Sequence, residues 1–260
     1  MTGVNINRAA ELLCQAHEAR VPISPLTERY PDMDVAAAYA IQQVNLRRRL
    51  SADAVVVGHK IGLTSKPMQD LLGVDEPDYG YIVDDMVLPN NGTVAATRFC
   101  APRVEPEVAF LLHTPLRGPS VTVDDVRAAT DAVAPALEIV DSRIADWKLT
   151  LPDTVADNAS SGAVVLGDWV SYTDDIDLAS ARAHLRLNDT EIDSGVGAAV
   201  MGDPAVAVAW LANAVAGFGT EILPGQFVMS GSFTSAAFVH PGDQAFTTIS
   251  GLGDVSVTFE

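Results

Sequence analysis

The stretch RVEPEVAFLL, residues 103–112, has the apolar texture of a buried β-strand, yet it carries two glutamates. Residues two apart on a strand point to the same face, so Glu105 and Glu107 are predicted to share one face. Pro106 cannot donate a ladder hydrogen bond, and it therefore predicts a sheet edge, a strand start or a bulge. The two acids could face solvent or pair with an arginine such as Arg103; otherwise they need another counter-charge.

A second apolar stretch, APALEIV at residues 134–140, is also typical of a strand and carries the single acid Glu138. Three carboxylates on apolar strands can form a cage for a hard divalent cation. Mg²⁺ and Mn²⁺ prefer such oxygen ligands and leave coordination positions for a substrate. We therefore predict a metal site made by Glu105, Glu107 and Glu138.

Upstream, VVVGHKIGLTSK at residues 55–66 predicts a strand on which Lys60 lies between Gly58 and Gly62 on one face. In one interpretation the lysine reaches towards solvent and the glycines serve a bend. In the other, the open space lets Lys60 contact an anionic substrate or move a proton, helped by a pKa that burial lowers. His59 faces away from Lys60 and is interpreted as structural.

Two polar segments are predicted to be loops. GVDEPDYG, residues 73–80, reads as a turn that carries Asp78, and DTVADNASSG, residues 153–162, offers Asn158 and Ser160. Such loops often only make turns or cap helices, so their residues alone do not assign them a role.

The remaining sequence predicts an α+β chain. Helical spacing and capping residues indicate helices over residues 5–20, 32–50, 122–133 and 204–217, the last with Asp203 as its cap and Pro204 at its first position. Strands are expected within residues 226–233, 237–249 and 254–260. The expected organisation is a single domain, with a helical N-terminal segment over about residues 1–52 and a β-rich body over about residues 53–260.

Composition excludes several classes of function. The 260 residues carry a formal net charge of −18, which repels nucleic acid and anionic membrane surfaces. Neither Cys14 nor Cys100 belongs to a C-x-x-C pair, which argues against a disulfide framework or a cysteine zinc site. No secretory signal is recognisable, so a cytoplasmic location is expected. No P-loop, H-E-x-x-H or G-x-S-x-G motif occurs, which argues against nucleotide binding and serine hydrolysis.

Seven segments in order resemble the 2-hydroxypenta-2,4-dienoate hydratases (2-keto-4-pentenoate hydratases) of aromatic and steroid meta-cleavage catabolism, in the fumarylacetoacetate-hydrolase-like superfamily. The segments are GHKIGLTSK, VDEPDYG, PRVEPEVAF, PALEIVDSRIADWK, DTVADNASSG, GDPAVAVAWLAN and GLGDVSVTF. Each is weak alone, but the ordered set spans nearly the whole chain. The resemblance implies a mixed β-roll or sandwich body, a bound Mg²⁺ or Mn²⁺, and a homo-oligomer, a pentamer or decamer, that can associate with pathway enzymes.

The resemblance also implies roles for individual residues. The metal acids match Glu105, Glu107 and Glu138; the catalytic positions match Lys60, Asp78 and Ser160; and Asn158 and Ser232 are assigned to substrate binding. The SGSF segment around Ser232 differs from the Ala-Leu-Gly type of segment in some hydratases, which leaves the substrate selectivity open.

The implied reaction is addition of water to 2-hydroxypenta-2,4-dienoate, or a close 2-hydroxy-2,4-dienoate, to give a 4-hydroxy-2-oxoacid. The substrate's C1 carboxylate and C2 oxygen would chelate the metal, and ketonisation would make C4 electrophilic towards water. Lys60 and Asp78 are the candidates for the proton steps, and the sequence leaves open which residue is acid and which is base.

Other functions stay open at this point. A 4-oxalocrotonate decarboxylase and a 2-oxohept-3-enedioate hydratase are the nearest alternatives, and both act on a substrate with a second carboxylate. The only basic residues after Lys148 are Arg182 and Arg186, which favours a substrate with one carboxylate. A non-catalytic partner subunit of a decarboxylase is an alternative from a different class. A metal-dependent C–C hydrolase is a weaker one, since His17 or His113 would have to activate water.

Overall fold

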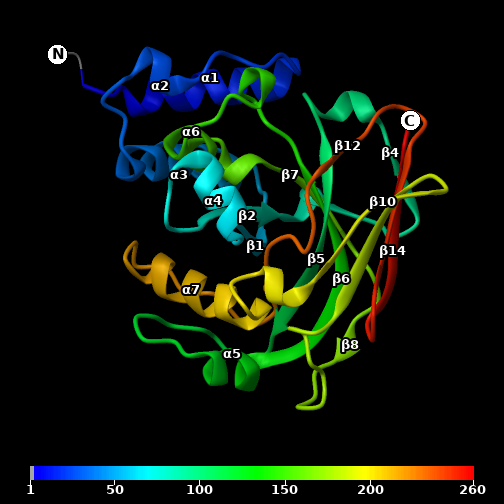
Figure 1. The fold of residues 1–260 in the computed structure, drawn as a ribbon. Helices are drawn as coiled ribbons and strands as arrows, with labels where there is room; N and C mark the ends of the chain where they lie inside the picture. Colours follow the sequence, from blue (N-terminus) through cyan, green and yellow to red (C-terminus); the bar gives the residue numbers. More distant parts are fainter. Residues whose placement is uncertain (1–2) are drawn as a thin grey trace.

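Two β-sheets and a group of helices make up the structure, a computed structural model that describes residues 3–260 except the side chains of residues 71 and 72. Residues 1 and 2 of the expected N-terminal segment lie outside the described residues. In the described chain, the larger sheet has nine strands and the smaller one five. The helices α1, α2, α3 and α6 lie together on one side of the large sheet, and the small sheet lies on the other (Figure 1). About a third of the chain is helical and a third is strand, which confirms the predicted α+β class.

The helices and strands have the following bounds. The helices are α1 (Ile6–Ala19), α2 (Leu26–Arg29), α3 (Val35–Ser51), α4 (Lys66–Leu72), α5 (Val123–Ala129), α6 (Leu151–Ala156) and α7 (Pro204–Ala216). The large sheet contains β1 (Val56–Gly62), β2 (Asp78–Val83), β3 (Val87–Leu88), β5 (Arg103–Leu112), β6 (Thr130–Val140), β7 (Ser161–Leu166), β8 (Val170–Ser171), β11 (Phe227–Met229) and β12 (Ala237–Phe238). The small sheet contains β4 (Gly92–Val94), β9 (Arg182–Leu187), β10 (Thr190–Val196), β13 (Gln244–Ile249) and β14 (Gly253–Phe259).

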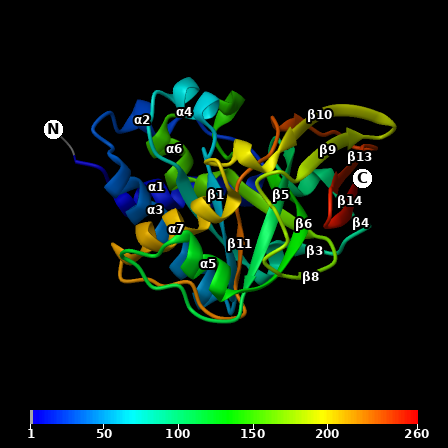
Figure 2. The ribbon, with the colours of Figure 1, turned by 60° about the horizontal axis from the view of Figure 1, so that its bottom comes forward.

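The order of the large sheet brings the segments with the predicted site residues side by side. Its path is β2-β1-β11-β5-β6-β7-β3, so the strand with Lys60 and the strands with the glutamates are separated only by the short β11. The view in Figure 2 shows β1, β11, β5 and β6 following one another across the sheet. Residues from distant parts of the sequence therefore meet on one sheet.

The N-terminal helices form where the sequence predicts them. The side chain of Asn5 accepts a hydrogen bond from Arg8 N at the start of α1, and Asp34 accepts one from Ala37 N at the start of α3. Such caps satisfy backbone donors that the first helical turn leaves free. The helix α1 packs on α3, which in turn packs on α6, and this helical group covers the sheet near the site.

The observed helices differ from the predicted ones in three places. The helix predicted over 122–133 ends at Ala129, because Thr130 already begins β6, whose residues pair with β5. The short helix α6 overlaps residues 153–162, which were predicted as a loop, and α4 lies where no helix was predicted. Each contains a proline in its first turn, and α6 begins with a capping box between Thr150 and Asp153. One or two helical turns show too little periodicity to be recognised in the sequence.

Pro106 does not mark a sheet edge, because β5 lies between β11 and β6. On the β11 side, however, β11 pairs only with residues 109–111 and β12 only with residues 103 and 104. The carbonyl of Pro106 lies in the gap between them and accepts a hydrogen bond from Phe233 N at 3.0 Å. The missing N–H of the proline thus falls where no strand continues the ladder, and the loop over residues 230–236 covers the glutamates there.

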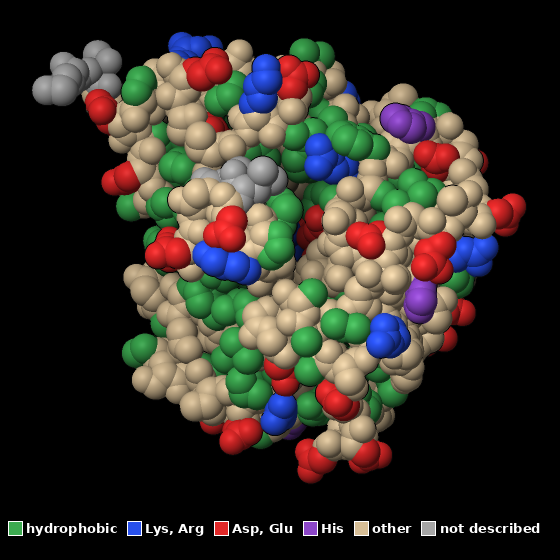
Figure 3. All heavy atoms as spheres, viewed as in Figure 1, with side chains coloured by type: hydrophobic (Ala, Val, Ile, Leu, Met, Phe, Trp, Pro, Cys, Tyr) green, Lys and Arg blue, Asp and Glu red, His purple; other side chains and the backbone are tan. Residues whose placement is uncertain are grey.

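The apolar stretch Gly197–Ala216 has the length and hydropathy of a membrane span, but half of it is buried inside the molecule. Only Pro204–Ala216 of this stretch is the α-helix α7, which Asp203 caps as predicted through Ala205 N at 2.8 Å. Its buried residues belong to the main hydrophobic core, so α7 is a core helix. The surface is rich in acidic side chains, and the face in Figure 3 is hollowed near its middle.

Candidate active site

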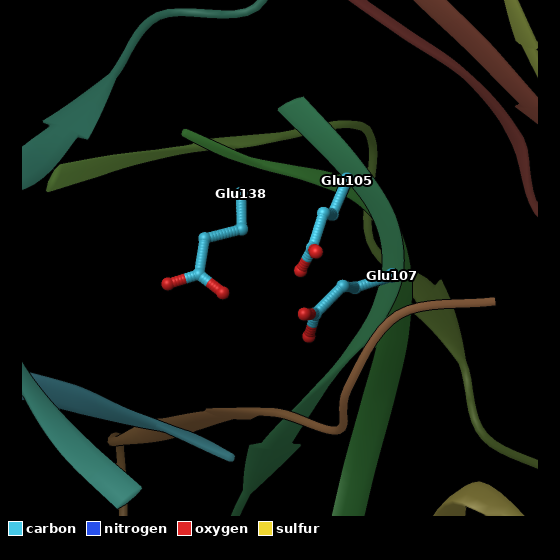
Figure 4. Close-up of side chains that lie close together, drawn as sticks. All are labelled: Glu105, Glu107 and Glu138. Carbon is cyan, nitrogen blue, oxygen red and sulfur yellow. The ribbon is translucent and has the colours of Figure 1, made fainter. Parts of the chain in front are cut away.

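The three predicted metal acids converge in the structure. Glu105 lies directly opposite Glu138 in the β5–β6 ladder, and Glu107 follows on the same face of β5. One carboxylate oxygen of each residue lies within 4.8 Å of the others. Figure 4 shows the three side chains pointing towards one another from the two strands. We call this group the acid cage. Like charges placed opposite each other on a sheet are destabilising, so the cage needs a compensating charge.

The donor atoms of the cage fit a divalent cation. Glu107 and Glu138 are fully buried. Glu107 Oε2 accepts a hydrogen bond from Gly231 N at 2.8 Å, whereas Glu107 Oε1 and both oxygens of Glu138 find no hydrogen-bond partner among the described residues. Leaving buried carboxylate oxygens unpaired is costly. Hard cations such as Mg²⁺ bind oxygen ligands of this kind, so these orphaned atoms could hold a metal.

Burial and mutual repulsion raise the pKa values of the three cage carboxyl groups. Burial, followed by the charge of Glu138, raises the pKa of Glu105 to about 7. Burial likewise raises the pKa of Glu107 and of Glu138, although Lys60 opposes the shift in both. The folded cage binds protons more tightly than the unfolded chain does. The metal-free protein therefore loses stability as the pH rises from the ordinary pKa of a glutamate towards the raised pKa of the cage, which is about 7 for Glu105.

Divalent cations should therefore stabilise the fold more at high pH than at low pH. At saturating Mg²⁺ we expect the melting temperature to rise by about 5–10 °C at pH 8. At about pH 5.5 the rise should be clearly smaller, because protons compete with the metal for the cage. Thermal unfolding with EDTA and with Mg²⁺ at both pH values measures this difference. A gain in melting temperature that is the same at both pH values would contradict proton–metal competition at the cage.

Lys60 reaches the cage from β1. Its side chain is buried, and Nζ lies 3.5 Å from Glu138 Oε2 and donates a hydrogen bond to the carbonyl of Ala159 at 2.7 Å. The expectation of a lowered pKa was wrong. Burial does lower the pKa of Lys60, but the nearby charges of Glu138 and Asp78 outweigh burial and raise it. Lys60 is therefore an ammonium that can hold an anion or donate a proton. His59 points to the other face, as predicted, and burial lowers its pKa to about 4.

Asp78 is the first residue of β2, directly across from Gly62 of β1. It is buried, and Oδ2 accepts a hydrogen bond from Thr154 Oγ1 at 3.1 Å, while Oδ1 has no hydrogen-bond partner in the described chain. Burial raises the pKa of Asp78, and the ammonium of Lys60 opposes this shift. A carboxyl group with a raised pKa can both take up and release a proton nearer to neutral pH.

The absence of a side chain at Gly62 makes room for this pair. A Cβ at Gly62 would lie 2.2 Å from Asp78 Oδ1 and 3.2 Å from Lys60 Nζ. The structure thus supports the prediction that the glycine leaves open space beside Lys60. The second flanking glycine, Gly58, faces Phe227 instead.

Gly62→Ala should consequently displace Asp78 and lower the turnover rate by about 10²-fold, which is the order of loss that follows a shift of about 1 Å at a reacting group. Steady-state kinetics and a melting curve of the purified variant measure the two effects separately. The matched control is Gly217→Ala, whose added Cβ meets only Ala214 O at an ordinary 3.4 Å. Full turnover in Gly62→Ala would show that the position of Asp78 does not matter.

A left-handed turn holds the remaining predicted residues. Asn158, Ala159 and Ser160 have φ values of 56°, 51° and 54°. This conformation costs roughly 1–2 kcal/mol for each residue other than glycine or asparagine. The turn is what brings the carbonyl of Ala159 to Lys60, and strain of this kind is often found at functional sites.

The structure gives the two predicted polar residues of this turn different surroundings. The amide of Asn158 accepts a hydrogen bond from Tyr81 N at 2.9 Å and donates one to Tyr81 O at 3.0 Å, so it fixes the turn to β2. Its assignment to substrate binding stays a prediction. Ser160 is buried, and its hydroxyl lies 3.4 Å from Thr154 Oγ1, which places it beside the partner of Asp78.

Thr154 and Ser230 are site residues that the sequence did not reveal. Thr154 lies on α6, inside the segment predicted as a polar loop, and binds Asp78. The T-x-x-D capping box at residues 150–153 was the signal that could have found the helix. Ser230 is fully buried, and its hydroxyl has no hydrogen-bond partner among residues 3–260. It begins the loop whose Gly231 N binds Glu107.

Ser232 lies on the same loop as Gly231. Its hydroxyl donates to the carbonyl of Thr234 at 2.9 Å and accepts from Thr234 N at 3.3 Å. Gly231 has a φ of +110°, and a Cβ there would lie 2.3 Å from Thr64 Oγ1, so only glycine fits. The loop is thereby held over the cage, and contact between Ser232 and a substrate stays a prediction.

Known proteins with similar sequences and a similar fold cover nearly the whole chain. Residues 53–260 match the family described as fumarylacetoacetate (FAA) hydrolase C-terminal. The chain is 43% identical to a 2-hydroxyhexa-2,4-dienoate hydratase of Comamonas testosteroni, over 98% of this chain and 97% of the relative. It is also 43% identical to a 2-keto-4-pentenoate hydratase of Paraburkholderia xenovorans strain LB400, over 100% of this chain and 97% of the relative.

Among solved structures, a 4-oxalocrotonate decarboxylase from Pseudomonas putida G7, complexed with magnesium and adipate, is similar over the full length of both chains. The TM-score is 0.94 and the sequence identity is 34%.

Proposed function

Because the chain belongs to the fumarylacetoacetate hydrolase family, among the 2-keto-4-pentenoate hydratases, we propose that it is a metal-dependent hydratase. It would add water to 2-hydroxypenta-2,4-dienoate, or a close 2-hydroxy-2,4-dienoate, and release a 4-hydroxy-2-oxoacid in meta-cleavage catabolism. The observation that carries this proposal is the acid cage with Lys60 and Asp78 beside it, in a chain that is 43% identical to named hydratases.

The acid cage is proposed to hold the cation through Glu105, Glu107 and Glu138, with Mg²⁺ or Mn²⁺ as the metal. When bound, such a cation would draw in the oxygens of the substrate's C1 and C2 and stabilise negative charge that develops there. The proposal is supported by the buried carboxylate oxygens of Glu107 and Glu138 that have no hydrogen-bond partner among the described residues, although Glu138 Oε2 also lies 3.5 Å from Lys60 Nζ. It is also supported by the magnesium complex of the similar decarboxylase.

Lys60 and Asp78 are proposed to share the electrostatic and proton-transfer work. The ammonium of Lys60, with its raised pKa, would hold the anionic substrate and stay charged through turnover. Asp78, whose pKa is raised by burial, would exchange a proton with the carbon chain or with the added water. Thr154 keeps Oδ2 of Asp78 in place by hydrogen bonding, which leaves Oδ1 free for this exchange.

The hydroxyl groups around the pair are proposed to bind water and substrate. Ser160 lies beside Thr154 and would hydrogen-bond the substrate or the added water. Ser232 would contact the substrate from the covering loop, and Asn158 would do so from the left-handed turn, although its amide is already bonded to β2.

A substrate with a second carboxylate is the second candidate, and Arg103 is the observation that favours it. Arg103 lies two residues before Glu105 on β5. Its guanidinium lies 4.2 Å from the ring centroid of Trp147 and 4.0 Å from that of Phe238. The two rings hold the guanidinium in place, and its buried Nε has no hydrogen-bond partner among the described residues, so it could bind a carboxylate. A dioate hydratase or a 4-oxalocrotonate decarboxylase could use such a group.

One comparison of substrates tests the proposal. The Mg²⁺-loaded protein is incubated with 2-hydroxypenta-2,4-dienoate or with 4-oxalocrotonate, and both the loss of substrate absorbance and the products are followed. Formation of 4-hydroxy-2-oxopentanoate from the first substrate supports hydration. Release of CO₂ from the second, with the first left unchanged, would replace hydration by decarboxylation. No reaction with either would favour the non-catalytic partner.

We further propose that the protein works in the cytoplasm as a homo-oligomer, a pentamer or decamer, in contact with other enzymes of its pathway. The proposal rests on the resemblance to the hydratases. Large exposed apolar side chains such as Phe218 and Phe238 are available for subunit contacts. Light scattering coupled to gel filtration measures the subunit number directly.

A further inference from the structure

A cavity lies away from the acid cage, and several arginine side chains line it. It has a volume of about 500 Å³, and residues of α1, α3 and the start of β7 contribute to its walls. Five arginines line it, although the chain as a whole has a net charge of −18 and only 16 basic residues. We call it the arginine cavity, and its arginines are Arg20, Arg48, Arg49, Arg98 and Arg143.

Three of these arginines already have an acidic partner. Arg143 Nε lies 2.6 Å from Asp157 Oδ1 and is buried. Arg49 forms an ion pair with Asp85 at 2.5 Å, and Arg48 forms one with Glu11 at 2.8 Å. The charges of these pairs largely cancel, so they do not by themselves call for a ligand.

The other two arginines have no acidic partner within residues 3–260. Arg98 Nη2 donates only to the backbone carbonyl of Asp85, at 2.7 Å. Arg20 ends α1 in the left-handed conformation, and its buried Nη1 finds no hydrogen-bond partner in the described chain. A buried guanidinium nitrogen without an acceptor is costly, so an acceptor from outside the chain would stabilise it.

Five arginines and three aspartates, Asp85, Asp141 and Asp157, line the cavity, so positively charged side chains are in excess. His17 also lines the cavity, and its pKa is lowered to about 4, first by burial and then by the charges of Arg143 and Arg20. The imidazole is therefore neutral at physiological pH and can donate or accept a hydrogen bond without adding charge. Asn158 and Ser161 form part of the wall and add further polar atoms.

We propose that the arginine cavity binds a small oxyanion with two negative charges, through Arg20 and Arg98. Guanidinium groups recognise phosphate and carboxylate oxygens by paired hydrogen bonds. The volume lies within the range of small-molecule sites, about 300–1,000 Å³. None of the acid-cage residues, Lys60 or Asp78 lines this cavity. The proposed anion ligands, Arg20 and Arg98, thus lie apart from the acid cage, although Asn158, in the turn beside the proposed catalytic site, is part of the cavity wall. The proposal does not depend on the proposed function.

Calorimetric titration of the Mg²⁺-loaded full chain with inorganic phosphate tests the proposal. The titration is done near pH 8, where phosphate is mainly a dianion, with chloride at equal ionic strength as the reference. We expect saturable binding of one phosphate per chain. Arg20→Gln or Arg98→Gln should weaken it by about 10-fold or more, the order expected for loss of a charge-assisted contact. The matched control is Arg182→Gln, an exposed arginine of β9 outside the cavity.

Arg20 and Arg98 belong to different segments of the chain, so one variant still tests the proposal if the other folds poorly. Glu107→Gln should keep its phosphate affinity, since the cage is not the site. The proposal is overturned if wild-type protein does not bind phosphate at millimolar concentration, or if both cavity variants bind it as wild type does. It is also overturned if Arg182→Gln weakens binding as much as they do, or if Glu107→Gln abolishes it.

Discussion

Glu107→Gln is expected to abolish tight binding of the divalent cation and to lower the hydratase rate by about 10³-fold or more. The cation is asked to supply several kcal/mol of charge stabilisation, and about 1.4 kcal/mol corresponds to a factor of ten in rate. Glu107 is fully buried, and its carboxylate accepts one hydrogen bond within the described chain, from Gly231 N. It therefore contributes little else to the stability of the fold. Metal content after dialysis and the rate with 2-hydroxypenta-2,4-dienoate measure the two losses.

The melting temperature distinguishes this effect from misfolding. Removing one of three buried, repelling carboxylates should leave the metal-free variant at least as stable as metal-free wild type near neutral pH. Glu191→Gln on β10 is the matched control, since Glu191 is exposed and outside the cage, and it should keep both metal and activity. A Glu107→Gln protein that binds one Mg²⁺ per chain and turns over normally would eliminate the cage as the metal site.

Lys60→Met should lower the turnover rate by about 10²–10³-fold, the order of loss that follows removal of one positioned donor that stabilises developing negative charge. Methionine has a similar length but no charge, so the carbonyl of Ala159 and Glu138 lose their contact with the ammonium. Metal binding should persist, because removing a neighbouring positive charge does not disfavour a cation. The expected signature is a bound metal together with a low kcat.

Lys148→Met provides the control, since this lysine is exposed on the surface. Lys60→Met could also reduce activity only by destabilising the protein, and a melting curve with Mg²⁺ tests that possibility. A variant that hydrates at the wild-type rate would remove Lys60 from the reaction. A variant that loses the metal would instead make Lys60 a support for the cage.

The local spacing of residues predicted much of the site. A period of two residues correctly predicted that Glu105 and Glu107 share one face of a strand. The same rule predicted that Lys60 and His59 point to opposite faces of β1. The pairing of Glu105 with Glu138 could not be derived from spacing, because strand register depends on the whole sheet. The apolar context of Glu138 suggested only that it is a third acid of the metal site, and the resemblance to the hydratases implied the same role.

The parts that could not be predicted depend on three-dimensional surroundings. Lys60 has a raised pKa because four acids from other strands lie near it, whereas sequence alone suggested only burial. Thr154 was hidden because α6 is a short helix inside a polar segment. Pro106 predicted a sheet edge, a strand start or a bulge, but an interrupted ladder within the sheet meets the same requirement.

The acid cage is expected to hold the cation on which hydration depends. The most direct measurement is to strip the protein with EDTA, titrate Mg²⁺ back, and follow bound metal and the rate of 4-hydroxy-2-oxopentanoate formation in the same samples. We expect the rate to be negligible without metal and to rise in proportion to bound Mg²⁺ until each chain holds one ion. Full hydratase activity in the stripped protein would contradict it.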